Sequence, residues 1–342
     1  MKNRWKYLTA LLLVLFIAAG VYFFFSANNK KSPGYSLSIL QNSLSSHDWA
    51  TFQKHIDLKS FYGSVFNEVI APTIRQPSDS FADQFLDGII QNIRTTFVDS
   101  MTEYTREIVT KNSSDKKPAL PEQIFARKFI SLIDFNNIIY KKISNTKITG
   151  NTATVDITIT NKTLNKDFLL QVSMRKLDDE TWQLVKIINI PEFLSALKKA
   201  QTEKLIALNK PISDEIAQEI VISTSNFDIK TRKTRGLSTA FIYKPTIIFK
   251  SAEKIVEFIG QVQILGKNNS ALFTQKYIVH GPFPIGAKQD YSFSWTLNPF
   301  IPGDKVLIEA NTSDLKIKET ILSVEFENGK HLQILEQIPT TN

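Results

Sequence analysis

The sequence contains no cysteine and only four histidines among its 342 residues. The lack of cysteine excludes disulfides, cysteine nucleophiles, thiolate metal sites and bacterial lipoprotein processing. The motifs HExxH, GxxxxGK[ST], GxGxxG and GxSxG and an acidic calcium loop are also absent, which removes the common signals for metal, nucleotide and nucleophile chemistry. We therefore expect no catalytic, cofactor-binding or metal-binding residues, and a protein that is not an enzyme.

Positive charge is concentrated at the N-terminus. The formal net charge is +8, and residues 1–34 carry five basic and no acidic side chains. Charge in the rest of the chain is nearly balanced, whereas a nucleic-acid-binding domain gathers Lys and Arg on one face. We expect no nucleic-acid partner.

An uncharged apolar run, YLTALLLVLFIAAGVYFFF, extends from Tyr7 to Phe25. About 20 such residues span the hydrocarbon core of a bilayer. Lys2, Arg4 and Lys6 precede the run and favour a cytoplasmic N-terminus. We predict a single-pass signal-anchor in the cell membrane, with the bulk of the chain extracytoplasmic. The alternative is a cleaved signal peptide with Ala18-Ala19-Gly20 near its end, which also exports the chain.

Residues 45–60, SSHDWATFQKHIDLKS, hold two histidines and two aspartates. Asp48 precedes an apolar stripe of helical spacing that begins at Trp49, and Asp57 precedes another that begins at Leu58. Aspartate at such positions accepts hydrogen bonds from the free N–H groups of the first helical turn. We interpret both aspartates as N-caps and His47 and His55 as structural, with a metal or catalytic site as the alternative.

Helical periodicity continues beyond this stretch. Apolar residues at helical spacing predict one helix around 58–70, a longer one around 81–108 with Pro77-Ser78 as its start signal, and another around 124–133. From residue 148 the period changes to two. The segments 148–160, 168–174 and 182–188 alternate apolar and polar residues, which predicts an antiparallel meander of three strands.

The order of helices followed by GNTATVDITIT and FLLQVSMRKLDDETWQLVKI resembles extracytoplasmic members of the nuclear transport factor 2-like, or cystatin-like, α+β superfamily. The stretches HDWATFQKHIDLKSF, FVDSMTE and WQLVKIINIP are more narrowly similar to a bacterial family with domain of unknown function 2939. This resemblance covers residues 35–190 and implies a curved antiparallel sheet around a long helix. It implies no reaction and no site residues.

The rest of the chain predicts a connector helix and an all-β unit. The segment PEFLSALKKAQTEKLIALNK begins with Pro191 as its start signal and is expected to end at Pro211. Beyond residue 217 the patterns predict seven or eight short strands, one of them KVLIEAN at 305–311. Asn328-Gly329 predicts a type I′ hairpin turn. These features are typical of an immunoglobulin- or fibronectin-III-like β-sandwich.

The predicted architecture is therefore α+β, in four parts. Residues 1–34 form the cytoplasmic tail, anchor and linker; 35–190 the cystatin-like domain; 191–216 the connector helix; and 217–342 the β-sandwich.

The cluster KTRKTR is the sharpest charged feature outside the anchor, and it comprises Lys230, Arg232, Lys233 and Arg235. Its two interpretations are a solvated loop and a contact with anionic wall polymer, lipid headgroups or an acidic partner. His280 and His331 are interpreted as strand-end residues. We expect a non-catalytic binding or scaffold protein for an envelope component or protein partner. The alternatives are a small-molecule or lipid carrier that uses the concave sheet, and an envelope hydrolase.

Overall fold

The computed structural model describes residues 31–74, 80–110, 138–232 and 238–339. The predicted anchor at Tyr7–Phe25, the Pro77-Ser78 signal and the helix expected at 124–133 lie outside these residues. In the described ranges, no helix is long and apolar enough to cross a membrane. The chain divides into two compact units with the boundary between Thr202 and Glu203. Its fold is α+β with antiparallel sheets, as predicted, and the C-terminal part is mostly β.

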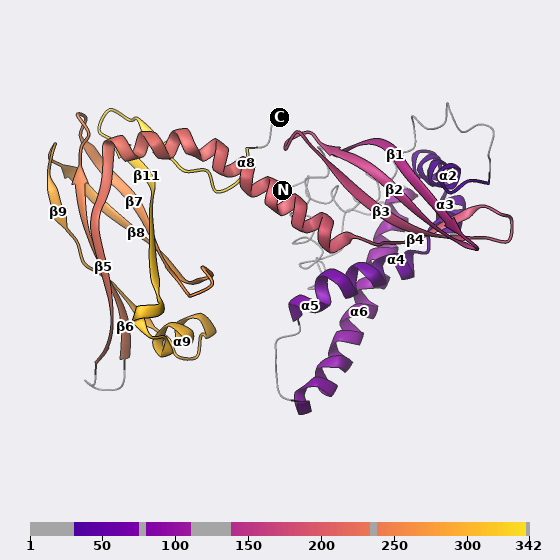
Figure 1. The fold of residues 1–342 in the computed structure, drawn as a ribbon, viewed down its shortest axis with the longest axis horizontal. Coiled ribbons are helices and arrows are strands. Elements are labelled where there is room, and N and C mark those ends of the chain that lie inside the picture. The colour runs from indigo at the N-terminus through magenta and orange to yellow at the C-terminus, as the bar shows by residue number, and fades with distance from the viewer. Residues whose placement is uncertain (1–30, 75–79, 111–137, 233–237, 340–342) are drawn as a thin grey trace. The chain divides into compact units, whose positions relative to one another are not determined.

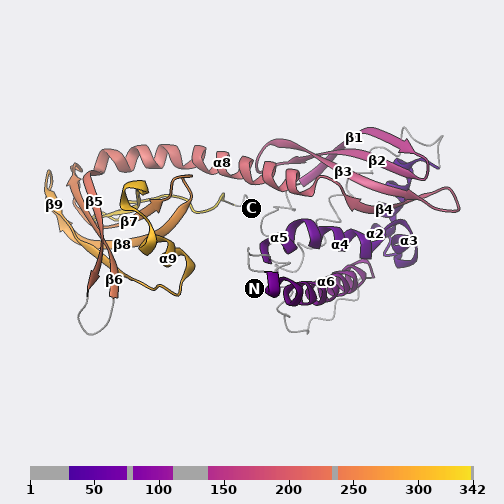
Figure 2. The same ribbon diagram turned by 60° about the horizontal axis from the view of Figure 1, so that its bottom comes forward.

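The first unit packs helices against one face of a four-stranded meander (Figure 2). Its helices are α2 (Pro33–Ser45), α3 (Trp49–His55), α4 (Leu58–Val65), a π-helix (Phe66–Ile70), α5 (Ala71–Ile74) and α6 (Ser80–Val109). Its strands are β1 (Ile138–Thr149), β2 (Thr152–Asn161), β3 (Lys166–Lys176) and β4 (Trp182–Ile187), paired in that order.

The alternation predicted for β2 and β3 is confirmed, because their inward side chains form the core with the stripe of α4. Val155, Ile157 and Ile159 are fully buried together with Phe61 and Phe66. The stripe predicted for α6 is confirmed only in its second half. Phe97 and Met101 are buried, whereas Ile89 is exposed.

The sheet differs from the prediction in two places. Strand β1 was missed, because register shifts between Tyr140 and Lys142 and between Ile143 and Asn145 interrupt its alternation. In β4, Ser173 pairs with Lys186 and Met174 with Leu184, so one extra residue forms a bulge. Ile187 is consequently buried and Ile188 exposed, and the predicted inward alternation fails after Leu184.

Helix α8 (Ile190–Glu219) contributes to both cores and contains Pro211, so the prediction that Pro211 ends it is wrong. Phe193 and Leu197 pack in the first core, and Ile216 packs in the second. Proline removes one backbone hydrogen bond from a helix. Two tertiary bonds near this point oppose that cost, since the Asn209 side-chain amide accepts from Leu335 N–H at 2.8 Å and donates to Leu335 O at 2.9 Å.

The second unit holds two four-stranded antiparallel sheets around one core. The first contains β5 (Ile220–Arg232), β6 (Ser238–Phe249), β9 (Lys288–Asp290) and β10 (Phe293–Leu297). The second contains β7 (Ile255–Leu265), β8 (Ala271–Phe283), β11 (Lys316–Phe326) and β12 (His331–Gln333). Rings from the two sheets meet in this core: Phe241 lies 4.8 Å from Phe273, and Tyr277 lies 4.3 Å from Phe293.

Two local predictions for this unit are wrong. The first five residues of the expected strand KVLIEAN belong instead to helix α9 (Pro302–Glu309), which has Pro302 and Asp304 in its first turn. Both residue types favour a helix N-terminus over a strand. The predicted hairpin between β11 and β12 exists. Of its two turn residues only Gly329 has positive φ, at 85°, so the turn is not type I′.

Candidate functional site

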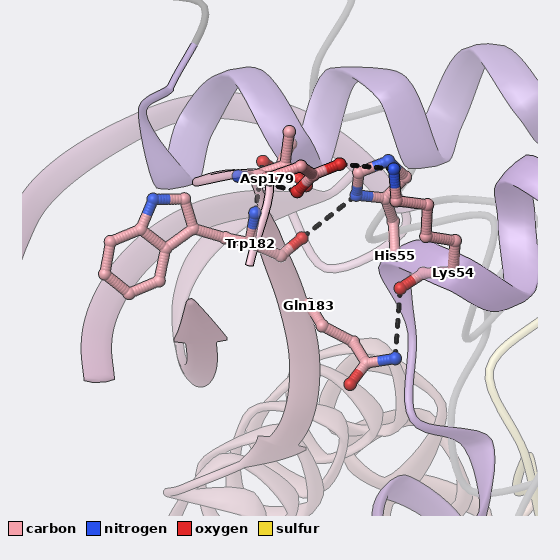
Figure 3. A network of polar contacts seen from close by, with 7 residues as sticks. Lys54, His55, Asp179, Trp182 and Gln183 are labelled. Atoms are coloured by element: carbon pink, nitrogen blue, oxygen red, sulfur yellow. Dashed lines mark hydrogen bonds and ion pairs between the residues drawn. The ribbon is translucent and has the colours of Figure 1, made fainter. Parts of the chain in front are cut away.

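The histidine- and aspartate-rich stretch lies where α3 meets the end of the β3–β4 hairpin (Figure 3). His55 is 3% exposed, and its Nδ1–H donates to the backbone oxygen of Trp182 at 3.1 Å. Burial lowers the pKa of His55 below its ordinary value of 6.5, and the bond to Trp182 opposes this only in part. The ring is therefore a neutral structural donor.

The polar groups around His55 also join the helices to the hairpin. Lys54 Nζ forms an ion pair with Asp179, and the Gln183 side chain donates to Lys54 O at 3.0 Å. The Asp179 carboxylate accepts hydrogen bonds from Lys54 and Thr181, and these bonds hold its pKa well below the usual range. Trp182, which is 2% exposed, receives support from two more segments: its N–H donates to Ser36 Oγ and its Nε1–H to Lys31 O, each at 2.8 Å.

Both aspartates are N-caps, as predicted. Asp48 accepts from Thr51 N–H and Asp57 accepts from Ser60 N–H, each at 3.0 Å. His47 has φ of 61° and its Nδ1–H donates to Val109 O, the last residue of α6, at 2.9 Å. That bond satisfies a carbonyl that the end of the helix leaves free. The stretch therefore contains two helix N-caps, at Asp48 and Asp57, and two histidines that donate hydrogen bonds to backbone carbonyl groups.

The other histidines lie on strands of the second unit. His280 lies in β8, and its Nδ1 is 2.8 Å from Glu257 Oε2 across the strand pair; its side chain is 75% exposed. His331 begins β12 and is exposed. Among the described residues, no group of three or more His, Asp or Glu side chains has an arrangement that could hold a metal ion.

The basic cluster lies at one end of the second unit. Lys230 is in β5, 3.1 Å from Asp228 and with a side chain that is 54% exposed, and Arg232 is the last residue of β5. Lys233 and Arg235 lie outside the described residues. The structure therefore places two of the four predicted contact residues by strand register.

An apolar turn lies at the same end. Leu297 of β10 and Thr231 of β5 both pair with Thr239 of β6, so they are about 10 Å apart, given strand spacings of about 4.8 Å. The turn that follows Leu297 presents Phe300, which is 92% exposed. Helix α9, which follows this turn, packs against β8 and β10 (Figure 1).

This turn is ordered by its own hydrogen bonds. Asn298 N–H donates to Asp304 Oδ2 at 2.9 Å, and Asn298 Oδ1 accepts from Phe300 N–H at 3.0 Å. Ile301 is 50% exposed and Val306 47% exposed, while the Lys305 side chain is 59% exposed. We call Phe300, Ile301, Val306 and Lys305 the Phe300 surface.

Sequence reasoning missed the apolar part of this surface, because 305–311 was assigned to a strand. The sequence PGDKVLIE does contain a signal for this helix, because proline and aspartate near its start are typical of a first helical turn. Comparison of the chain with models of protein families, with curated proteins and with solved structures gives no match.

Proposed function

We propose that this chain is an exported, membrane-anchored binding protein of the cell envelope. In this proposal the apolar segment Tyr7–Phe25 holds it in the membrane, and the Phe300 surface contacts an envelope component. The observation that carries the binding role is the 92% exposure of Phe300 on a hydrogen-bonded turn.

Single exposed apolar residues are ordinary on protein surfaces. The Phe300 surface differs because three large apolar side chains occur within one turn and the start of α9. Burying a phenylalanine is worth about 1.5–3 kcal/mol. An ordered turn that keeps a phenylalanine exposed to solvent is typical of a surface that binds a partner.

The proposal includes the finer fold assignments. Helices on one face of a four-stranded meander support the cystatin-like resemblance of the first unit. Two antiparallel sheets around one aromatic core support an immunoglobulin- or fibronectin-III-like sandwich in the second.

The carrier alternative receives less support from the same features. A carrier needs an apolar cavity between sheet and helices. Val155, Ile157 and Leu170 on the inward face of the sheet are instead buried in one cluster with helical side chains such as Phe61 and Phe97.

Export and binding can be tested together in living cells. A reporter that is active only outside the cytoplasm, fused after Asn342, should be active, and the N-terminal mass should show an uncleaved anchor. A photo-crosslinking residue at Ile301 should form adducts in intact cells, whereas the same residue at Ile285, which is 64% exposed, should not. An inactive reporter refutes export, and equal adducts at both positions refute binding through the Phe300 surface.

A further inference from the structure

We propose that Asn328 is a site of spontaneous deamidation, and that the carboxylate of Glu253 slows this reaction while the protein is folded. The sequence holds one Asn–Gly pair, Asn328-Gly329. The pair lies in the exposed turn between β11 and β12. The modification would convert a neutral side chain into a negatively charged one at a fixed place in the second unit, and it goes beyond the proposed binding role.

Deamidation needs only water and atoms of the chain itself. The backbone nitrogen of Gly329 attacks Cγ of the Asn328 side chain, the Cγ–Nδ2 bond breaks, and ammonia leaves with the proton that the Gly329 nitrogen loses. Water then opens the resulting five-membered imide at either carbonyl, which leaves aspartate or isoaspartate at position 328. Glycine favours the first step, because it has no Cβ to shield its nitrogen and adopts the widest range of backbone angles.

The folded turn engages the attacking nitrogen in a hydrogen bond. Gly329 N–H donates to Phe326 O at 3.0 Å, and Gly329 has φ of 85°. Phe326 N–H donates in turn to Lys330 O at 2.9 Å, which closes the hairpin. The Gly329 nitrogen has to lose its proton to react, so it has to give up the first of these bonds, at a cost in free energy. We therefore expect slower deamidation in the folded than in the unfolded chain.

The amide that is attacked is held at both of its polar atoms. Asn328 Nδ2 donates to Glu253 Oε2, and Asn328 Oδ1 accepts from Lys330 N–H at 2.9 Å. The bond to Glu253 is charge-assisted, which is the stronger kind. Because Nδ2 departs as ammonia, the reaction cannot be completed without loss of this bond.

Glu253 also opposes the product of the reaction. Deamidation would place a new carboxylate at position 328, and like charges that lie close together repel each other. The nearby cation Lys330 already pairs with Glu215 at 2.9 Å and with Glu219 at 3.7 Å. We therefore expect deamidation to weaken this turn, and hydrogen exchange of the β12 amides to rise in parallel with the converted fraction.

The test follows the reaction in the full chain, kept in detergent at mildly alkaline pH. Mass spectrometry of peptides measures the fraction converted at Asn328 with time. Glu253→Ala removes both the acceptor and the charge, and it should accelerate conversion about threefold to tenfold, the range expected for the loss of one hydrogen bond. Glu253→Gln keeps an acceptor without the charge and should react at an intermediate rate.

Two controls separate a direct effect of Glu253 from a general one. Glu253 and Asn328 are 75 residues apart in sequence, so in concentrated urea the wild type and Glu253→Ala should react at the same, faster rate. Asn269, in the exposed turn between β7 and β8, precedes a serine and serves as a reference within the same sample. Its rate should be equal in all three folded proteins. Glu253 is exposed, and circular dichroism checks that both variants are folded.

Three results would overturn the proposal. Absence of conversion at Asn328 in urea would show that it is not a deamidation site. Equal folded rates in the wild type, Glu253→Ala and Glu253→Gln would show that Glu253 gives no protection. Acceleration at Asn269 to the same extent as at Asn328 would assign the effect to a general loosening of the second unit.

Discussion

The carboxylate of Asp304 accepts a hydrogen bond from Asn298 N–H at 2.9 Å and thereby ties the first turn of α9 to the end of β10. Between these two residues lies Phe300. We expect Asp304→Ala to accelerate hydrogen exchange at the Asn298 amide, because its acceptor is lost. Asp304→Asn retains a side-chain oxygen and should exchange more slowly than the alanine variant. Unchanged exchange in both variants would show that other contacts hold the turn.

Gly260 is required by the ring of Tyr277, its cross-strand partner. A Cβ at Gly260 would lie 2.1 Å from Tyr277 Cζ. We expect Gly260→Ala to lower the free energy of unfolding by about 1–3 kcal/mol through overpacking. The control is Gly88→Ala in α6, where a Cβ meets nothing within 4 Å. This substitution should raise the free energy of unfolding by about 0.5–1 kcal/mol.

A double-mutant cycle tests the cause of the Gly260 effect. With Tyr277→Val, which removes the ring, Gly260→Ala should cost less than it does in the wild-type background. Strict additivity of the two free energies would contradict a steric origin.

His55 should make stability depend on pH. Burial lowers its pKa in the folded state from 6.5, so between that lower pKa and 6.5 the unfolded chain binds more protons than the folded one. The neutral ring therefore contributes fully above pH 6.5, and stability falls as the pH drops below that value. His55→Asn keeps a donor for Trp182 O but does not titrate. We therefore expect this variant to show a weaker dependence of the free energy of unfolding on pH in this window, measured by denaturant titration.

A dependence of stability on pH that persists unchanged in His55→Asn would show that the titrating group lies elsewhere in the chain.

Asp57 should contribute to stability as the N-cap of α4. Asp57→Ala removes the acceptor for Ser60 N–H at 3.0 Å, and we expect a loss of about 1 kcal/mol in the free energy of unfolding. Asn caps helices about as well as Asp, so Asp57→Asn should recover most of this loss. Equal losses in both variants would assign the effect to the ion pair with Arg175, at 3.5 Å.

Much of the local structure was predictable because its determinants are close in sequence. The caps at Asp48 and Asp57 act on residues three positions later, and alternation along β2 and β3 reflects the side-chain period of a strand. The same patterns predicted the α+β class. They failed at β1, in β4 and at 305–311, where register shifts or first-turn residues replace a simple period.

The sequence by itself determined most of the helices and strands and which aspartates begin helices, since neighbouring residues decide these through backbone geometry and spacing. Only the tertiary structure decided that α8 continues through Pro211, that His55 is buried against Trp182, and that Leu297 and Thr231 lie on either side of Thr239. Each of these depends on pairing between residues distant in the chain. The free energy of such pairing comes from a shared core or sheet, which no local pattern of side chains specifies.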